Sequence, residues 1–156
     1  MEVDRNEISR DNRRISVQLQ QQADRLMAQK GLTAVQARLL LYILDHSEDG
    51  ISLTEVHREF GYSMAALSSL VKRLKEKGYV QRVPCAGDDR KKILYGTKKG
   101  EEVREFLNRS FFRAQDQLYS GFSQEELSML DRLQKKILRN LAALTQQNSN
   151  KEESET

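Results

Sequence analysis

Three short signals divide this chain into helices. In each, a serine or threonine is followed three residues later by a glutamate or glutamine, the pair that closes the first turn of a helix through reciprocal hydrogen bonds. The pairs are Thr33 with Gln36, Ser52 with Glu55, and Ser123 with Glu126. Each stands just before apolar residues at helical spacing. The chain is therefore predicted to be mainly α-helical.

Apolar periodicity and glycine stops predict the extent of each helix. An amphipathic N-terminal helix is predicted to end near Gly31. Further helices are predicted from Thr33 to the turn at 47–50, from Ser52 to Phe60, from Ser63 to Gly78, from Thr97 to Gly121, and from Ser123 onward. The polar segment 146–156 is predicted to be a disordered tail.

A short β-element interrupts the helical pattern. Residues 79–83 and 92–95 are rich in β-formers, and Pro84 and the turn-forming run Gly87-Asp88-Asp89 separate them. This spacing predicts a β-hairpin with a charged tip.

Charge is concentrated in the middle of the chain. The net charge is only +3, but residues 63–100 hold 10 basic and 3 acidic residues, while segments 1–62 and 101–156 each have a net charge of −2. A patch of this kind indicates a polyanionic partner. On charge alone, a solvated lysine-rich surface explains the pattern equally well.

Composition excludes several classes of protein. The chain has one cysteine, Cys85, and two histidines, His46 and His57, which cannot form a disulfide scaffold or a Cys/His zinc cluster. We expect no metal site and no cofactor. Apolar runs are far shorter than the roughly 20 residues that span a bilayer, and no secretory signal is recognisable, so we expect a cytoplasmic protein without a membrane partner. No catalytic motif is found either, and we expect no enzyme.

The helices on either side of Phe60-Gly61-Tyr62 match a helix-turn-helix. Helical geometry turns the small and cationic side chains of the second helix away from its apolar face. These outward residues are Ala65, Ser68, Ser69, Lys72 and Arg73. An ordinary helical hairpin would show the same apolar spacing. The basic hairpin that follows favours DNA, because it is placed to act as a wing on the backbone or minor groove.

Four segments in order resemble the MarR family of transcriptional regulators. They are LTAVQARLLLYIL (32–44), SLTEVHREFG (52–61), SSLVKRLKEKGYVQR (68–82) and GDDRKKILYGTKKG (87–100). The resemblance covers nearly the whole chain and implies a winged helix-turn-helix homodimer. It implies dimerisation helices at 1–31 and 101–145 around a DNA-binding region at 32–100, in one intertwined domain. It also implies a repressor of pseudo-palindromic operators that is released by a small-molecule effector.

The resemblance also implies roles for individual residues. Ser63, Ala65, Ser68, Ser69 and Lys72 would belong to the recognition helix in the major groove, with Arg73 near a phosphate. In the wing, Asp88 would orient Arg90 toward the minor groove, and Lys91 and Lys92 would neutralise phosphates. Without the resemblance, Asp88 and Arg90 would be interpreted as a surface ion pair of little energetic value.

The chain departs from the family pattern at two positions. Gly96 replaces a usually apolar residue beside Thr97, and Cys85, which we expect at the base of the wing, does not occupy the position of the reactive cysteine in oxidant-sensing relatives. We expect Cys85 to be inert. The effector residues stay unassigned; aromatic side chains near 106–122 fit a pocket for a small aromatic or amphipathic ligand, but fit a helix interface better.

Two other functions compete with DNA binding. A helical dimeric adaptor would use the same terminal helices to hold another protein and would bind no operator. A small-molecule enzyme would need a catalytic constellation that the sequence does not contain.

Overall fold

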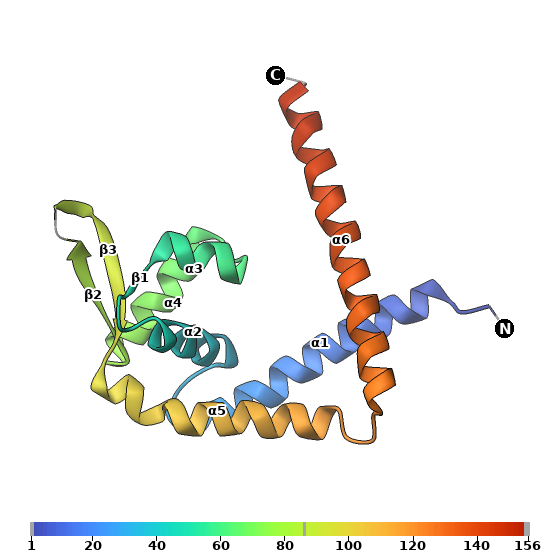
Figure 1. The fold of residues 1–156 in the computed structure, drawn as a ribbon, viewed down its shortest axis with the longest axis horizontal. Helices are drawn as coiled ribbons and strands as arrows, with labels where there is room; N and C mark the ends of the chain where they lie inside the picture. The colour runs from blue at the N-terminus through green and yellow to red at the C-terminus, as the bar shows by residue number, and fades with distance from the viewer. Residues whose placement is uncertain (1, 86, 155–156) are drawn as a thin grey trace. The chain divides into compact units, whose positions relative to one another are not determined.

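The computed structural model describes residues 2–85 and 87–154, without the side chains of 89–91 and 150–154. Its elements follow one another in the order shown in Figure 1. They are α1 (Arg5–Met27), the 3₁₀ helix η1 (Ala28–Lys30), α2 (Ala34–Asp45), β1 (Ile51–Ser52), α3 (Leu53–Phe60), α4 (Met64–Glu76), β2 (Val80–Cys85), β3 (Asp88–Gly96), α5 (Lys98–Leu118) and α6 (Gln124–Ser154). The mainly helical prediction with a small β-hairpin is confirmed.

The chain forms two compact units. One extends up to Ala114 and the other begins at Gln115, so the boundary falls inside α5. The first unit contains the helix-turn-helix and the sheet. The second consists of the last residues of α5 together with the whole of α6. No helix in the described ranges has the length and apolarity needed to cross a bilayer.

All three capping boxes form as the sequence predicts. In the box at Ser123, the main-chain N–H of Ser123 donates to Glu126 Oε2 at 2.8 Å, and the N–H of Glu126 donates to Ser123 Oγ at 3.1 Å. The boxes at Thr33 and Ser52 have the same reciprocal bonds. These contacts satisfy N–H groups that a helix otherwise leaves unpaired, so they fix where α2, α3 and α6 begin.

The core of the first unit is formed mainly by α2 and α4. Leu39, Leu40 and Ile43 of α2 are fully buried, as are Leu67 and Leu74 of α4. From α1, only Ala23 and Met27 in the last turns are buried. α5 is joined to the end of α2 by an ion pair from Arg104 to Asp45 at 2.5 Å. The hydrogen bond with Glu101, opposed in part by burial and reinforced by Asp45, raises the pKa of Arg104.

The sheet has three antiparallel strands in the order β1-β3-β2, one strand more than the predicted hairpin. β1 has only two residues, with Ile51 opposite Leu94 and Ser52 opposite Ile93. So short a strand has no periodicity of its own, and its pairing depends on a partner more than 40 positions away in the chain. The strand anchors the start of α3 to the wing.

Gly96 is a close-approach position at the end of β3. A Cβ there would collide with Leu44 Cδ2 and would lie 3.1 Å from Ser47 Oγ. The main-chain N–H of Gly96 donates to the same Ser47 Oγ at 2.8 Å. The glycine that stands here in place of an apolar residue therefore lets β3 lie closer to α2.

The segment predicted to be a disordered tail is helical as far as Ser154. Residues 146–154 continue α6, which is 31 residues long. Extending an existing helix adds one hydrogen bond for each residue fixed and avoids the cost of nucleation. Ser149 Oγ also donates to the carbonyl of Thr145 at 3.1 Å. Residues 155 and 156 lie outside the described residues.

Candidate nucleic-acid interface

Burial decides which face of α4 is available to a partner. Leu67, Val71 and Leu74 are at most 1% exposed. Because successive residues turn by about 100°, the opposite face centres on Ala65, Ser69 and Lys72, and all three are exposed. This face combines small side chains near the helix start with a cation further along, so another surface can approach it closely.

The remaining predicted residues of this helix lie at its start and along its edges. Ser63 is the N-cap and is exposed, and its Oγ accepts from the N–H of Ala66 at 3.1 Å. Arg73 is exposed on one flank of the outward face, whereas Ser68 on the other flank is half-buried. Ser68 thus points less directly outward than the sequence analysis assumed.

Lys75 is a further exposed cation that sequence reasoning left out of the site. It lies three residues after Lys72 and seven after Ser68, which places it on the same flank as Ser68. Counting positions around the helix would have included it. Within the described side chains, Lys72, Arg73 and Lys75 take part in no ion pair. Their charges are therefore open to an external anion.

The turn between α3 and α4 is built from a glycine and a row of aromatic rings. Gly61 has φ +67°, a left-handed conformation that ends α3. The ring of Phe60 lies 5.3 Å from that of Tyr42 and 6.4 Å from that of Tyr62. Burial, with the negative charges of Glu59 and Glu55, raises the pKa of Tyr42. The row connects α2 to the start of α4.

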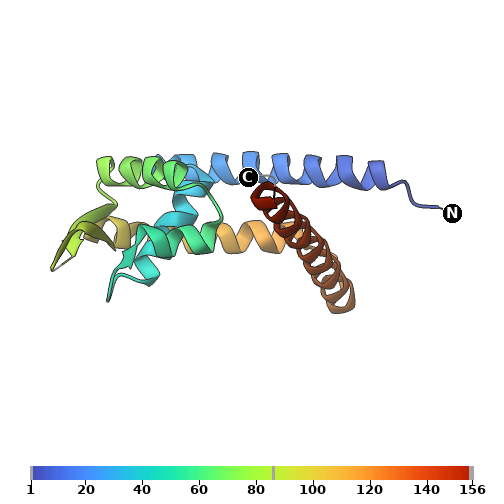
Figure 2. The same cartoon turned by 90° about the horizontal axis from the view of Figure 1, so that it is seen from above.

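The hairpin of β2 and β3 forms the wing, which extends beyond the helices in both views (Figures 1 and 2). Pro84 pairs with Lys92 and Cys85 with Asp88, so β3 has an irregularity between Asp88 and Lys92. Lys92 and Asp88 are exposed. The side chains of Arg90 and Lys91 lie outside the described residues, so their predicted roles stay predictions.

Cys85 lies next to the tip of the wing, and its predicted position at the base is wrong. It is the last residue of β2 and is half-buried opposite Asp88. β2 continues two residues beyond the predicted end of the strand at Val83, and its pairing with β3 shifts register between Pro84 and Cys85. Pro84, which was predicted to separate the two strands, occupies a strand position opposite Lys92.

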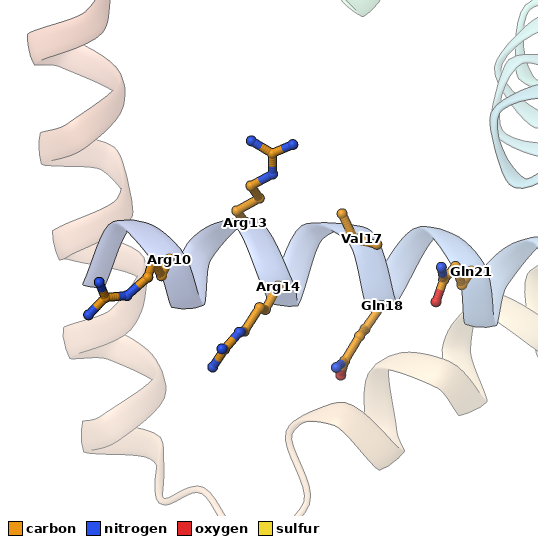
Figure 3. A pocket seen from close by; sticks show the side chains of 6 residues that line it. All are labelled: Arg10, Arg13, Arg14, Val17, Gln18 and Gln21. Atoms are coloured by element: carbon orange, nitrogen blue, oxygen red, sulfur yellow. The ribbon is translucent and has the colours of Figure 1, made fainter. Parts of the chain in front are cut away.

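The terminal helices present a second kind of surface. Residues 5–19 of α1 are all exposed, and a shallow groove on this helix is lined by Arg10, Arg13, Arg14, Val17, Gln18 and Gln21 (Figure 3). On α6, an apolar stripe at helical spacing is open to solvent. It includes Leu133, Ile137, Leu141 and Leu144, which are 48–55% exposed. Exposed apolar surface of this extent is typical of an interface.

Comparison with known proteins points to one family. Residues 30–91, which include α2, β1, α3, α4 and most of the wing, match the model of the MarR family. Over these residues the chain is similar to the MarR family of transcriptional regulators. Its winged helix-turn-helix fold agrees with that of the solved MarR-family structures, and the resemblance inferred from the sequence is confirmed.

Three relatives illustrate how far the likeness of this chain to known proteins extends. The uncharacterised HTH-type transcriptional regulator YybA of Bacillus subtilis (strain 168) is 22% identical over 112 residues, which are 72% of this chain and 75% of YybA. MepR of S. aureus in complex with DNA has a TM-score of 0.81 and 25% identity, covering 89% of this chain and 99% of MepR. A mutant MarR from E. coli in complex with operator DNA has a TM-score of 0.75 and 23% identity, covering 87% and 99%.

Proposed function

We propose that this MarR-family protein regulates transcription by binding specific operator DNA through α4 and the wing. The observation that carries the proposal is the outward face of α4, where small side chains lead to cations that pair with no carboxylate in the described part of the chain. The known complexes of MepR and MarR with DNA have the same fold. α4 enters the major groove, where Ser69 and Lys72 reach base edges and Arg73 and Lys75 contact phosphates.

The wing contributes mainly through charge. Lys92, with Lys91 and Arg90, lies on β3 in the wing, which follows α4 and reaches the neighbouring backbone or minor groove. Phosphate contacts of this kind release counterions, so affinity falls steeply as salt rises. The base contacts of α4 supply sequence preference, and the wing supplies affinity for any duplex.

The functional unit is a homodimer. The first turns of α1 and the apolar stripe of α6 expose more apolar surface than a stable monomer usually leaves in water. A second copy of the chain covers this surface and places two α4 helices about 34 Å apart, one helical turn of DNA. The operator is therefore pseudo-palindromic.

The regulator acts as a repressor that a small aromatic or amphipathic effector releases. An effector weakens DNA binding only if it binds one dimer geometry better than another, thereby changing the spacing of the two α4 helices. Its site stays unassigned.

Selection of binding sites from random duplex DNA, combined with analytical ultracentrifugation, tests the proposal. We expect a dimer that enriches an inverted repeat with half-sites one helical turn apart. A chain that enriches no sequence, and whose weak DNA binding is insensitive to salt, would contradict it. A dimer that binds another protein and no operator would establish the adaptor function instead.

A further inference from the structure

The turn that leads into the recognition helix is held by a side chain that the functional assignments above do not use. The Nδ1 atom of His57 lies 2.6 Å from the main-chain oxygen of Tyr62. A carbonyl oxygen can only accept, so Nδ1 carries the proton and donates. The bond links the last turn of α3 to Tyr62, the residue directly before the N-cap of α4.

The bond acts on the segment that sets the direction of α4. Tyr62 precedes Ser63, whose Oγ accepts from the N–H of Ala66 at 3.1 Å and whose carbonyl accepts from the N–H of Leu67 at 3.0 Å. Holding the Tyr62 carbonyl limits rotation of the peptide that enters Ser63. The start of α4 is thereby fixed relative to α3, beyond what the left-handed Gly61 provides.

The same turn lacks deep burial. Gly61, Tyr62, Ser63 and Met64 are all exposed, and the ring of Tyr62 touches only the edge of the aromatic row through Phe60. Packing alone therefore holds this segment weakly, and a single hydrogen bond has more influence on it than it would in the core.

We infer that His57 is a positioning residue for DNA recognition: its Nδ1–H···O bond to Tyr62 holds the start of α4 in the orientation that reads base edges. The inference rests on the proposed function. His57 touches no DNA in this role. It supports the discrimination between operator and random DNA, because base contacts depend on orientation more strongly than phosphate contacts do.

Two isosteric variants separate the hydrogen bond from the ring. The amide nitrogen of asparagine occupies the place of Nδ1, whereas the longer side chain of glutamine puts its amide nitrogen near the place of Nε2. His57→Asn thus keeps a donor for the Tyr62 carbonyl, and His57→Gln moves it away. His46 provides a matched control, because its Nδ1 also contacts a main-chain oxygen, that of Tyr42 at 2.8 Å, but at the end of α2 and not within the turn itself.

The test measures affinity for the selected operator and for random duplex at one salt concentration. We expect His57→Gln to lower operator affinity roughly two- to tenfold, the range that one hydrogen bond provides, with little change in affinity for random DNA. His57→Asn and His46→Gln should keep the ratio of the two affinities. If His57→Asn and His57→Gln have the same operator affinity, the inference is overturned. It is also overturned if His57→Gln loses affinity for the operator and for random duplex by the same factor, because that result indicates a phosphate contact.

Amide hydrogen exchange of the full chain without DNA gives a second readout. In His57→Gln, exchange at the amides of Ala66 and Leu67 should rise roughly two- to tenfold relative to His57→Asn, since both donate to Ser63. Unchanged exchange at these amides would overturn the inference. If the wild-type chain enriches no operator but exchange rises as expected, the proposed function fails while the positioning bond stands.

Discussion

The winged helix-turn-helix and the terminal helices use apolar residues in opposite ways. Among the described residues, all buried apolar side chains except Ala23, Met27 and Leu107 lie between Leu32 and Leu94. By contrast, α6 buries none of its described side chains, although it carries leucines and an isoleucine at helical spacing. One region completes its core within a single chain, and the other leaves its apolar stripe in water.

The two regions therefore differ in what stabilises them: the winged region packs its apolar residues within one chain, whereas α6 does not. A helix gains most of its stability from packing its apolar face, so an isolated α6 lacks the contribution that α4 receives from α2. We therefore expect changes in the winged region to act on folding of each chain, and changes on α6 to act on association. The predictions below test this division, from the largest expected effect to the smallest.

The largest effect is expected from the core of the winged region. Leu67 of α4 is completely buried, so Leu67→Ala should lower the free energy of unfolding by about 2–5 kcal/mol through lost transfer energy and a residual cavity. Lys72→Ala, on the exposed face of the same helix, should change it by less than about 0.5 kcal/mol. Chemical denaturation at equal protein concentrations measures both. Similar losses for the two variants would contradict the assignment of the buried face.

On α6, charge in the apolar stripe should separate association from folding. The double variant Ile137→Asp and Leu141→Asp should convert the proposed dimer to a monomer, because it places carboxylates in the proposed apolar interface. Operator affinity should fall by about 100-fold or more, since the two half-sites are then no longer bound together. Sedimentation and DNA titration provide the readouts.

The exposed Ala143 lies away from this stripe and gives the control, Ala143→Asp, which should remain dimeric. A double variant that remains dimeric would show that the stripe is not the interface.

At the junction of β3 and α2, Gly96→Ala should destabilise the chain by about 1–3 kcal/mol through overpacking. The new methyl group would collide with Leu44, so the double variant with Leu44→Ala should lose less than the sum of the two single losses. Thermal unfolding of the four proteins in the cycle measures this coupling. Simple additivity would show that the contact between Gly96 and Leu44 is not the cause.

The smallest effects distinguish the wing from the recognition helix. Lys92→Ala should weaken binding to all duplexes alike by a few-fold and reduce the slope of log affinity against log salt by about 1. Ser69→Ala should leave that slope unchanged and alter the preferred sequence at one position of the half-site. Titrations at several salt concentrations and repeated site selection compare the two. A change of sequence preference in Lys92→Ala would reverse the assigned roles.

Local signals in the sequence predicted the elements well and their contacts poorly. The capping boxes at Thr33, Ser52 and Ser123 depend on hydrogen bonds between residues three positions apart, so the helix starts follow from the sequence alone. The outward position of Ser69 and Lys72 follows from the same periodicity. The half-burial of Ser68 does not, because it depends on which neighbouring elements cover the edge of α4.

The sequence by itself determined the helical segments up to residue 145, the hairpin, the cationic character of residues 63–100 and the resemblance to a family. Each of these depends on side chains close together in the chain. Only the tertiary structure decided the pairing of β1 with β3, the close approach of Gly96 to α2 and the place of Cys85 near the wing tip. These features join distant segments or depend on a bulge, and no local pattern specifies which backbone groups meet. The bond from His57 to Tyr62 spans only five residues, yet it too needed the structure, because a turn must first bring the ring and the carbonyl together.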